Sequence, residues 1–195
     1  MNKNFLEVLL AKGFEEESLK ILKRKKNLRI IDISNFKLKN QSSIKSFDGS
    51  FLVQSKDSIV LDKKKLRCVT KLKPSKKELV EIQFAFNISK HVKSNAIVLC
   101  NKFSTIGIGA GQPSRLDSCK IAVQKARQFQ PLKIKNSIAA SDAFFPFADG
   151  INILIKAGVK TIIQPGGSIR DQEVINAADK SKVKMFFTGI RHFNH

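Results

Sequence analysis

Hydrophobic residues recur alternately at helical and at strand spacing from residue 76 to the end of the chain. In residues 76–92, Leu79, Ile82 and Phe86 share one helical face, and Pro74 and Ser75 precede it. The patterns predict further helices over 114–129, 150–157 and 169–181, and strands over 95–101, 105–111, 159–164 and 183–189. We expect the first two of these strands to form a hairpin around residues 102–104. The alternation of strands and helices predicts a layered α/β fold.

The first 75 residues carry a weaker pattern. They predict a strand over 5–11, a helix over 15–26 and a strand over 28–33. The helix has its acidic residues first and its basic residues last, which suits the helix dipole. Strands over 50–54 and 66–70 flank a polar turn, whereas 34–50 and 130–140 are expected to be connecting segments.

Two helix starts carry capping signals. Ser114 and Asp117 have the spacing of a capping box for the helix over 114–129. Ser168 follows a Pro-Gly-Gly turn and precedes the helix over 169–181, so we expect its side chain to cap that helix.

Length and composition bound the class of protein. A chain of 195 residues fits one domain or two closely packed subdomains. No stretch of about 18 apolar residues occurs, so no membrane span is expected, and the first residues lack the features of a secretory signal. Cys68, Cys100 and Cys119 are odd in number without a CxxC spacing, which predicts reduced thiols in the cytosol, two of them in the core.

The net charge of +20 favours an anionic partner, such as a phosphate, a polycarboxylate or a nucleic acid. An A/T-rich coding sequence that enriches Lys, Asn and Ile explains the same excess without any function. The basic residues lie in scattered turns, without an RNP pattern, a zinc-finger spacing or interleaved aromatics. A nucleic-acid partner is therefore not favoured.

Glycine-rich turns at 107–115, 147–150 and 165–168 offer places where the backbone could approach a ligand, although such turns are also ordinary connectors. The first turn lacks both the dinucleotide fingerprint and a Walker motif. His91, His192 and His195 have no zinc-ligand spacing, and we expect the tail histidines to be solvated. No zinc site is predicted.

Residues 141–150, Ser-Asp-Ala-Phe-Phe-Pro-Phe-Ala-Asp-Gly, fit no helix or strand pattern. Three aromatic rings lie between Asp142 and Asp149, as a wall with a carboxylate at each end. The alternative is that the rings belong to the core, which we expect at least for Phe145; Asp142 could instead support a turn.

Five blocks carry a resemblance to a known family: residues 90–99, 105–118, 141–150, 157–179 and 187–195. In this order they resemble the carboxyl-terminal part of the bifunctional AICAR transformylase / IMP cyclohydrolase family of purine biosynthesis. Residues 5–31 and 47–54 are similar to the segments that precede these blocks, so the resemblance covers nearly the whole chain.

The resemblance implies a reaction and a set of ligand contacts. In this family a formyl group passes from 10-formyltetrahydrofolate to the 5-amino group of AICAR, and the cyclohydrolase domain then closes the ring to IMP. By resemblance, the residues that would contact AICAR are Glu7, Asn95, Arg115, Phe144 and Arg191, with Asn95 assisting catalysis and Arg191 near the phosphate. Those that would contact the folate are Leu116, Asp149, Ser168 and Ile169. A potassium ion is a further expectation near residues 141–150.

The resemblance also implies an architecture, namely cytidine-deaminase-like layered α/β subdomains without a zinc site. Residues 1–75 would end the first subdomain and connect it to a second over 76–195, in a cytosolic homodimer whose site is shared across the interface. The family's catalytic Lys-His pair and its cyclohydrolase domain have no counterpart in this sequence. We therefore expect the chain to expose an apolar face where an amino-terminal part of the enzyme docks.

Three hypotheses remain open. The chain is one piece of a transformylase that works with a separate amino-terminal piece, or it is an inactive fragment that keeps the ligand contacts. Outside the family, it is a basic nucleic-acid-binding module.

Overall fold

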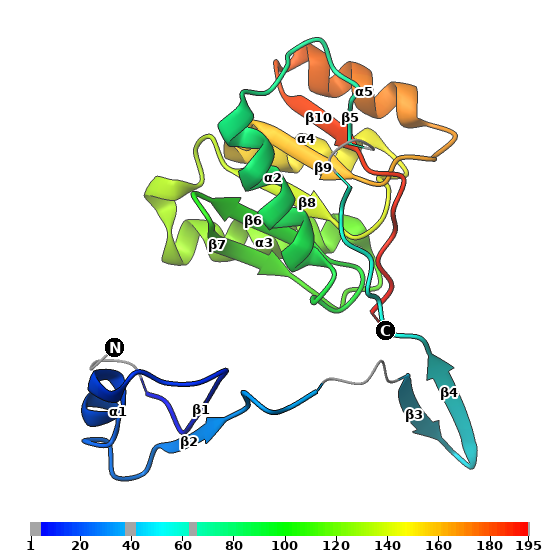
Figure 1. Ribbon diagram of the computed structural model, residues 1–195. Coiled ribbons are helices and arrows are strands. Elements are labelled where there is room, and N and C mark those ends of the chain that lie inside the picture. Colours follow the sequence, from blue (N-terminus) through cyan, green and yellow to red (C-terminus); the bar gives the residue numbers. More distant parts are fainter. Residues whose placement is uncertain (1–4, 38–41, 63–65, 195) are drawn as a thin grey trace. The chain divides into compact units, whose positions relative to one another are not determined.

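A computed structural model describes residues 5–37, 42–62 and 66–194. The chain divides into two compact units, 1–56 and 57–195 (Figure 1). The division expected from the resemblance, at residues 75 and 76, stays a prediction.

The first unit contains a short β-α-β segment and a hairpin. Strands β1 (Val8–Ala11) and β2 (Arg29–Asp32) pair in parallel, and helix α1 (Glu16–Leu22) connects them. Strands β3 (Ser43–Phe47) and β4 (Ser50–Gln54) pair antiparallel. The hairpin exposes large apolar side chains on both faces: Ile44, Phe47, Phe51, Leu52 and Val53. That a partner segment covers them stays a prediction.

The second unit is built on a mixed six-stranded sheet in the order β5-β10-β9-β8-β6-β7. Its strands are β5 (Arg67–Cys68), β6 (Ile97–Asn101), β7 (Ser104–Gly109), β8 (Ile138–Ser141), β9 (Thr161–Gln164) and β10 (Lys184–Phe187). Strands β8, β9 and β10 are parallel, whereas β6 and β7 form an antiparallel hairpin beside β8. The carboxyl ends of the three parallel strands therefore lie along one edge of the sheet.

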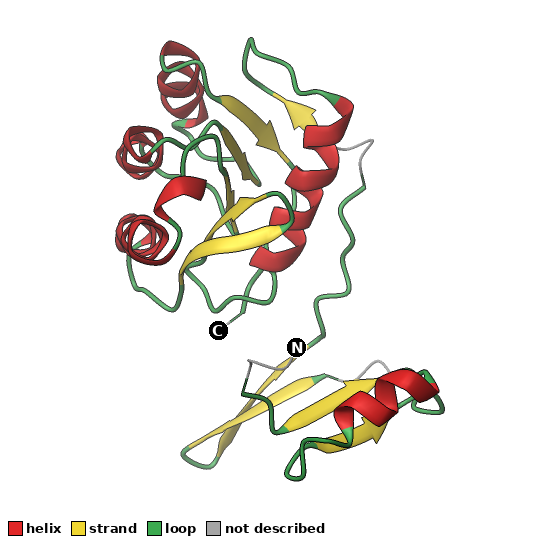
Figure 2. Cartoon of the chain, turned by 90° about the vertical axis from the view of Figure 1, so that its left-hand side faces the viewer, coloured by secondary structure: helices red, strands yellow, loops and turns green. Residues whose placement is uncertain are grey.

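Helices cover both faces of this sheet (Figure 2). Helix α2 (Lys76–Ser89) lies on one face, and α3 (Arg115–Phe129), α4 (Ala148–Ala157) and α5 (Asp171–Lys180) lie on the other. A short 3-10 turn, η1 (Pro131–Lys133), follows α3. The mixed α/β class predicted from the sequence is confirmed.

Side-chain alternation along the strands divides the core into two layers. In β6, Ile97 and Leu99 face the cluster that includes α3, α4 and α5, whereas Val98 and Cys100 face the cluster of α2. All four side chains are essentially inaccessible to solvent. A strand that is buried on both faces explains why its sequence is continuously apolar.

Two glycines of β7 allow α3 to approach the sheet closely. A Cβ atom at Gly107 would lie 2.2 Å from the carbonyl oxygen of Ala122, and one at Gly109 would lie 1.9 Å from that of Ser118. Both obstacles are helix backbone, so any side chain would force the helix outward. Gly107 and Gly109 thus serve helix packing, a role that was not among the alternatives considered from the sequence, which were ligand approach and an ordinary connection.

Most predicted elements of the second unit are confirmed, including the hairpin around residues 102–104. The two predicted caps are wrong. Ser114 makes no capping hydrogen bond, and α5 begins at Asp171 with Arg170 as its N-cap residue. A capping box that we did not predict joins Ser75 and Glu78 at the start of α2, where the Ser-x-x-Glu spacing could have revealed it.

Other differences concern segments with weak patterns. Strand β3 lies within the predicted loop 34–50, and β8 begins within the predicted link 130–140. The predicted strand over 50–54 is confirmed as β4, which pairs with β3, and that over 66–70 is present only as the two-residue β5, which pairs with β10. His192 is buried rather than solvated, with its ring against Phe86; His195 lies outside the described residues.

Candidate functional site

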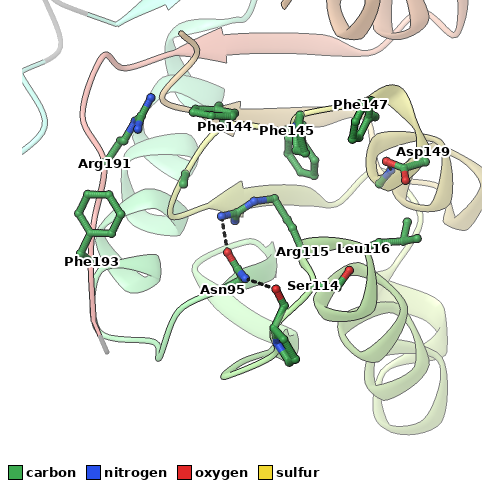
Figure 3. Close-up of a pocket in the computed structure, with 14 residues that line it drawn as sticks. Asn95, Ser114, Arg115, Leu116, Phe144, Phe145, Phe147, Asp149, Arg191 and Phe193 are labelled. Atoms are coloured by element: carbon green, nitrogen blue, oxygen red, sulfur yellow. Dashed lines mark hydrogen bonds between the residues drawn. The ribbon is translucent and has the colours of Figure 1, made fainter. Parts of the chain in front are cut away.

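A pocket of about 620 Å³ opens at the edge of the sheet where β8 ends (Figure 3). Ligand sites of open α/β sheets occur outside the carboxyl ends of the strands. Strand β8 is one of the parallel strands, and the pocket lies beyond its carboxyl end. We call this the aromatic pocket; its lining is Asn95, Pro113, Ser114, Arg115, Leu116, Ala143, Phe144, Phe145, Pro146, Phe147, Asp149, Gly150, Arg191 and Phe193.

Arg115, the first residue of α3, is held by three polar partners. One terminal nitrogen donates to Asp142 at 2.5 Å and to the Ser141 hydroxyl at 2.8 Å. The other donates to Oδ1 of Asn95 at 2.8 Å. The side chains of Arg115 and Asp142 are 10% and 2% exposed, so this is a buried ion pair. Such bonding fixes the guanidinium in place and leaves part of its donor capacity for a ligand.

The side chain of Asn95 is oriented just as firmly. Its amide nitrogen donates to the carbonyl oxygens of Gln112 and Pro113 at 2.9 and 3.1 Å. The backbone carbonyl of Asn95 accepts from the Ser118 hydroxyl at 2.8 Å. Both amide hydrogens are therefore used, and Oδ1 keeps one lone pair beside the bond from Arg115. Toward a ligand in the pocket, Asn95 can act as a hydrogen-bond acceptor.

The aromatic residues after β8 divide into core and wall. Phe145 is 1% exposed, as predicted, and its backbone N–H donates at 2.8 Å to the side chain of Gln164. Gln164 ends β9 and is completely buried, so it anchors this loop to the sheet. Phe144 is half-buried and Phe147 is exposed, and both line the pocket. The wall is thus formed by Phe144 and Phe147, with Phe145 beneath them.

Two cationic side chains lie on the faces of this wall. The guanidinium carbon of Arg191 is 4.5 Å from the ring centroid of Phe144, and that of Arg170 is 4.8 Å from Phe147. Arg170 also pairs with Glu173 at 3.5 Å, whereas Arg191 forms no ion pair with a carboxylate among the described residues. A cation that rests on a ring is partly ordered but keeps its donors available. Arg191 is therefore suited to an anionic ligand group.

Asp149, in the first turn of α4, presents an exposed carboxylate at the opposite side of the pocket from Arg191 (Figure 3). One carboxylate oxygen accepts from the N–H of Gly150 at 2.6 Å.

The thiol of Cys119 is buried near the same turn. A Cβ atom at Gly150 would lie 3.4 Å from its sulfur. Burial raises the pKa of this thiol to about 12, against a smaller lowering by Arg115. Cys119 therefore keeps its proton at neutral pH.

The predicted contacts do not all share this pocket. Asn95, Arg115, Leu116, Phe144, Asp149 and Arg191 line it. Ser168 and Ile169 follow the turn after β9; Ser168 is half-buried, and Ile169 is fully exposed. Ser168 accepts from the backbone N–H of Arg170 at 3.1 Å. Glu7 belongs to the first unit, so its proximity to the other contacts stays a prediction.

Some residues that organise the pocket carried little or no signal in the sequence. Asp142 holds Arg115, which differs from the turn support considered for it from the sequence. Gln164, 19 positions along the chain from Phe145, fixes the aromatic loop through the backbone N–H of that residue. Phe193 closes the pocket from the carboxyl-terminal segment. A pairing such as that of Gln164 with the backbone of Phe145 leaves no spacing in the sequence by which it could be found.

The described residues contain neither a cluster of metal-ligating side chains nor a helix that could span a membrane. No group of three or more His, Cys, Asp and Glu side chains among them could hold a metal ion. No helix of this part is both long and apolar enough to cross a membrane. The expected potassium ion stays a prediction.

A family model and three curated relatives indicate the same protein family for this chain. The model of the AICARFT/IMPCHase bienzyme family matches residues 1–125. The chain is 46% identical over 191 residues to a bifunctional purine biosynthesis protein PurH of Aquifex aeolicus. It is 48% identical over 193 residues to that of a Thermoanaerobacter species and 48% identical over 202 residues to that of a Chelativorans species.

These alignments cover 98–99% of the chain but only 37% of each relative. The chain thus spans little more than a third of the length of the curated relatives it matches. Among solved structures, a bifunctional pyrimidine deaminase/uracil reductase of Thermotoga maritima gives a TM-score of 0.35 at 14% identity, over 53% of this chain and 33% of that one. That similarity is too low to support an argument about fold or function.

Proposed function

Because the chain belongs to the AICARFT/IMPCHase bienzyme family, we propose that it is part of an AICAR transformylase domain and that its aromatic pocket binds AICAR beside a folate. The convergence of Asn95, Arg115, Phe144, Asp149 and Arg191 on one pocket supports this proposal. These residues come from four separate parts of the sequence, and each was selected for ligand contact by the family resemblance.

The pocket's polar groups match the functional groups of AICAR. The free lone pair of Asn95 Oδ1 accepts a hydrogen bond from the 5-amino group or the carboxamide N–H. Arg115 donates to the carboxamide oxygen from the face that its three bonds leave free. Arg191 binds the phosphate. Because these side chains are already fixed, little conformational entropy is lost when the ligand binds.

The folate binds on the side of Asp149. Its pterin ring stacks by the aromatic wall, and the exposed carboxylate accepts from the ring's amino and N–H donors. Leu116 contacts the same ring, and Ser168 and Ile169 contact the rest of the folate beyond the turn after β9. The two substrates then meet in the pocket with the formyl carbon next to the AICAR amine.

The reaction is a formyl transfer. The amine nitrogen of AICAR attacks the formyl carbon of 10-formyltetrahydrofolate, the bond from that carbon to N10 breaks, and one proton passes from the amine to N10. Holding the weakly nucleophilic amine against the formyl carbon lowers the barrier by up to roughly 7–11 kcal/mol. Asn95 orients the amine, and the Lys-His pair that handles the proton and the oxyanion comes from a part of the enzyme outside this chain.

The remaining features of the proposal follow the family. The cyclohydrolase domain lies in the rest of the enzyme, which works as a cytosolic homodimer. The second unit would have the cytidine-deaminase-like arrangement, with the subdomain beginning at residue 76. A potassium ion near residues 141–150 would be structural.

The test joins this chain with an amino-terminal transformylase segment from a relative that carries the Lys-His pair. We expect formation of formylated AICAR from 10-formyltetrahydrofolate only when both pieces are present, and a loss of at least tenfold for Asn95→Ala. Asn176→Ala, on the exposed face of α5, is the matched control and should leave the rate unchanged.

Two results would count against the proposal. If isothermal titration detects no AICAR binding by either the chain or the reconstituted pair, the pocket does not have the proposed ligand. If AICAR binds but the pair has no activity, the inactive-fragment hypothesis is favoured.

A further inference from the structure

A second hollow, of about 520 Å³, adjoins the aromatic pocket through Arg191, which lines both. We call it the arginine hollow. Its lining is Arg67, Pro165, Gly166, Gly167, Phe187, Thr188, Gly189 and Arg191. These residues belong to short β5, to the turn after β9, and to the end of β10 and the segment after it; Figure 1 labels the three strands.

The two arginines of the hollow are held in the same way. The guanidinium carbon of Arg67 lies 5.9 Å from the ring centroid of Phe187, as that of Arg191 lies 4.5 Å from Phe144. A phenyl face orients a guanidinium without using up its N–H donors. Among the described residues, neither arginine forms an ion pair with a carboxylate, although other surface cations do.

The floor of the hollow is shaped for close approach. Gly166 has φ +73°, and a Cβ atom there would lie 2.4 Å from the ring of Phe187. A Cβ atom at Gly167 would lie 3.9 Å from a terminal nitrogen of Arg191, so this guanidinium lies against the turn. Both positions favour glycine, the second through φ +92°. The turn thus leaves open the space between the two arginines.

None of the described residues that line the hollow is acidic. The carboxylate beside the turn, Asp171, accepts hydrogen bonds from the N–H groups of Gly167 and Ser168 at 2.7 and 3.2 Å. Within the described part of the chain, two positive side chains therefore share one cavity without a carboxylate partner. A bound oxyanion would reduce the repulsion between the two guanidinium groups and could accept hydrogen bonds from both.

We propose that the arginine hollow is an oxyanion site in which Arg67 is a second cationic contact beside Arg191. This inference rests in part on the proposed function, because two groups of its substrates carry the required chemistry: the phosphate of AICAR and the glutamate carboxylates of the folate. Arg67 lies before residue 90, where the first resembling block of the second unit begins. The family resemblance therefore did not select Arg67 as a ligand contact.

The first arm of the test uses inorganic phosphate as the probe and the full chain. Phosphate should shift the NMR amide signals of Gly167 and Gly189, and Arg67→Gln should weaken this binding about tenfold, a loss typical of a charge-assisted hydrogen bond. Arg127→Gln removes the same charge from the distant outer face of α3 and should change the affinity less than twofold. Circular dichroism checks that each variant is folded.

The second arm identifies the source of the oxyanion. If the hollow binds the AICAR phosphate, Arg67→Gln weakens AICAR about tenfold but leaves AICA riboside, which lacks the phosphate, unchanged. If it binds the folate tail, the same variant weakens folic acid instead. Arg67→Lys should keep part of either affinity, since it retains the charge but not the planar fork.

The outcomes separate this inference from the proposed function. Equal affinities of wild type and Arg67→Gln for phosphate, AICAR and folic acid would overturn the oxyanion site while AICAR binding itself still supports the proposed function. Phosphate binding that depends on Arg67, without AICAR or folate binding by either the chain or the reconstituted pair, would support the site and contradict the proposed function.

Discussion

The carboxylate of Asp142 lies 2.5 Å from the guanidinium of Arg115, and the two side chains are 2% and 10% exposed. The pair joins the end of β8 to the start of α3, and a second nitrogen of the same guanidinium holds Asn95. One buried carboxylate therefore supports two of the side chains proposed to bind AICAR.

Asp142→Asn removes the negative partner of this buried pair. Leaving one buried charge without its partner costs about 3–5 kcal/mol, so we expect a loss near the lower value because the asparagine can still accept a hydrogen bond. Urea denaturation followed by circular dichroism measures it. Asp117→Asn breaks a pair with Lys120 in which both side chains are about half exposed, and it should cost less than about 0.5 kcal/mol. Equal losses in the two variants would contradict the structural role of Asp142.

Asp149→Asn should separate the two substrates. The carboxylate is proposed to accept from the pterin ring, and loss of a charged hydrogen bond costs about 1.5–3 kcal/mol. We expect folic acid to bind about 10- to 150-fold more weakly, as measured by fluorescence titration. AICAR affinity should stay within twofold, because its contacts lie on the other side of the pocket. A parallel loss for both ligands would indicate a general disturbance of α4 instead.

Phe144→Leu removes the ring on which Arg191 rests. Cation–π contacts at accessible sites contribute about 0.5–1 kcal/mol, so AICAR should bind about two- to fivefold more weakly. Calorimetry can resolve this difference. Phe129→Leu replaces a 64% exposed ring at the end of α3, away from the pocket, and should have no effect. An unchanged AICAR affinity in Phe144→Leu would mean that Arg191 does not need this ring.

The buried thiols predict a dependence on alkaline pH. Burial raises the pKa of Cys100 and of Cys119 from 9.0 to about 12. Above pH 9 the unfolded chain therefore loses these protons before the folded chain does, and the free energy of unfolding should fall as the pH rises from 9 toward 12. Double replacement of both cysteines by alanine should flatten this decline, whatever its effect on stability at neutral pH.

The same shifts predict slow thiol chemistry in the folded protein. Only Cys68, which is half-buried, should react readily with a disulfide reagent at pH 8, and all three cysteines should react after denaturation. Rapid reaction of all three thiols in the native protein would show that the core opens locally.

Gly109→Ala should destabilise the second unit. The added methyl group would meet the backbone of α3 at 1.9 Å, and overpacking of this kind costs about 1–3 kcal/mol. Ser104→Ala, at an exposed position of the same strand, is the control and should change the free energy of unfolding by less than about 0.5 kcal/mol. Because α3 carries Arg115, the glycine variant should also weaken AICAR binding in conditions where it is folded.

The sequence predicted elements best where a strong pattern coincided with burial. Strand β6 is a continuous apolar run, and α2 has a clear helical face, so both were identified. Strand β8, with two alanines and no β-branched residue except Ile138, has a weak intrinsic strand preference. Its place in the centre of the sheet comes from pairing with β6 and β9, which local sequence does not encode.

The sequence predicted which residues line the candidate pocket better than it predicted how they are held in place. Family resemblance selected six of its lining residues, yet it could not indicate how they are held in place. The roles of Asp142 and Gln164 depend on contacts between elements that are distant in the sequence. The cap predicted at Ser168 was wrong for a different reason. The local capping rule made Ser168 the acceptor at the start of α5, whereas the carboxylate of Asp171 accepts from the backbone N–H of Ser168.

The β3–β4 hairpin has a practical consequence for every measurement proposed above. This two-stranded sheet exposes apolar side chains such as Ile44, Phe51 and Val53. Exposed apolar strands can pair with other copies of the chain, so the hairpin favours self-association in solution. Titrations should therefore be run at low micromolar protein with light scattering recorded alongside, and Phe51→Lys should raise the concentration at which turbidity begins.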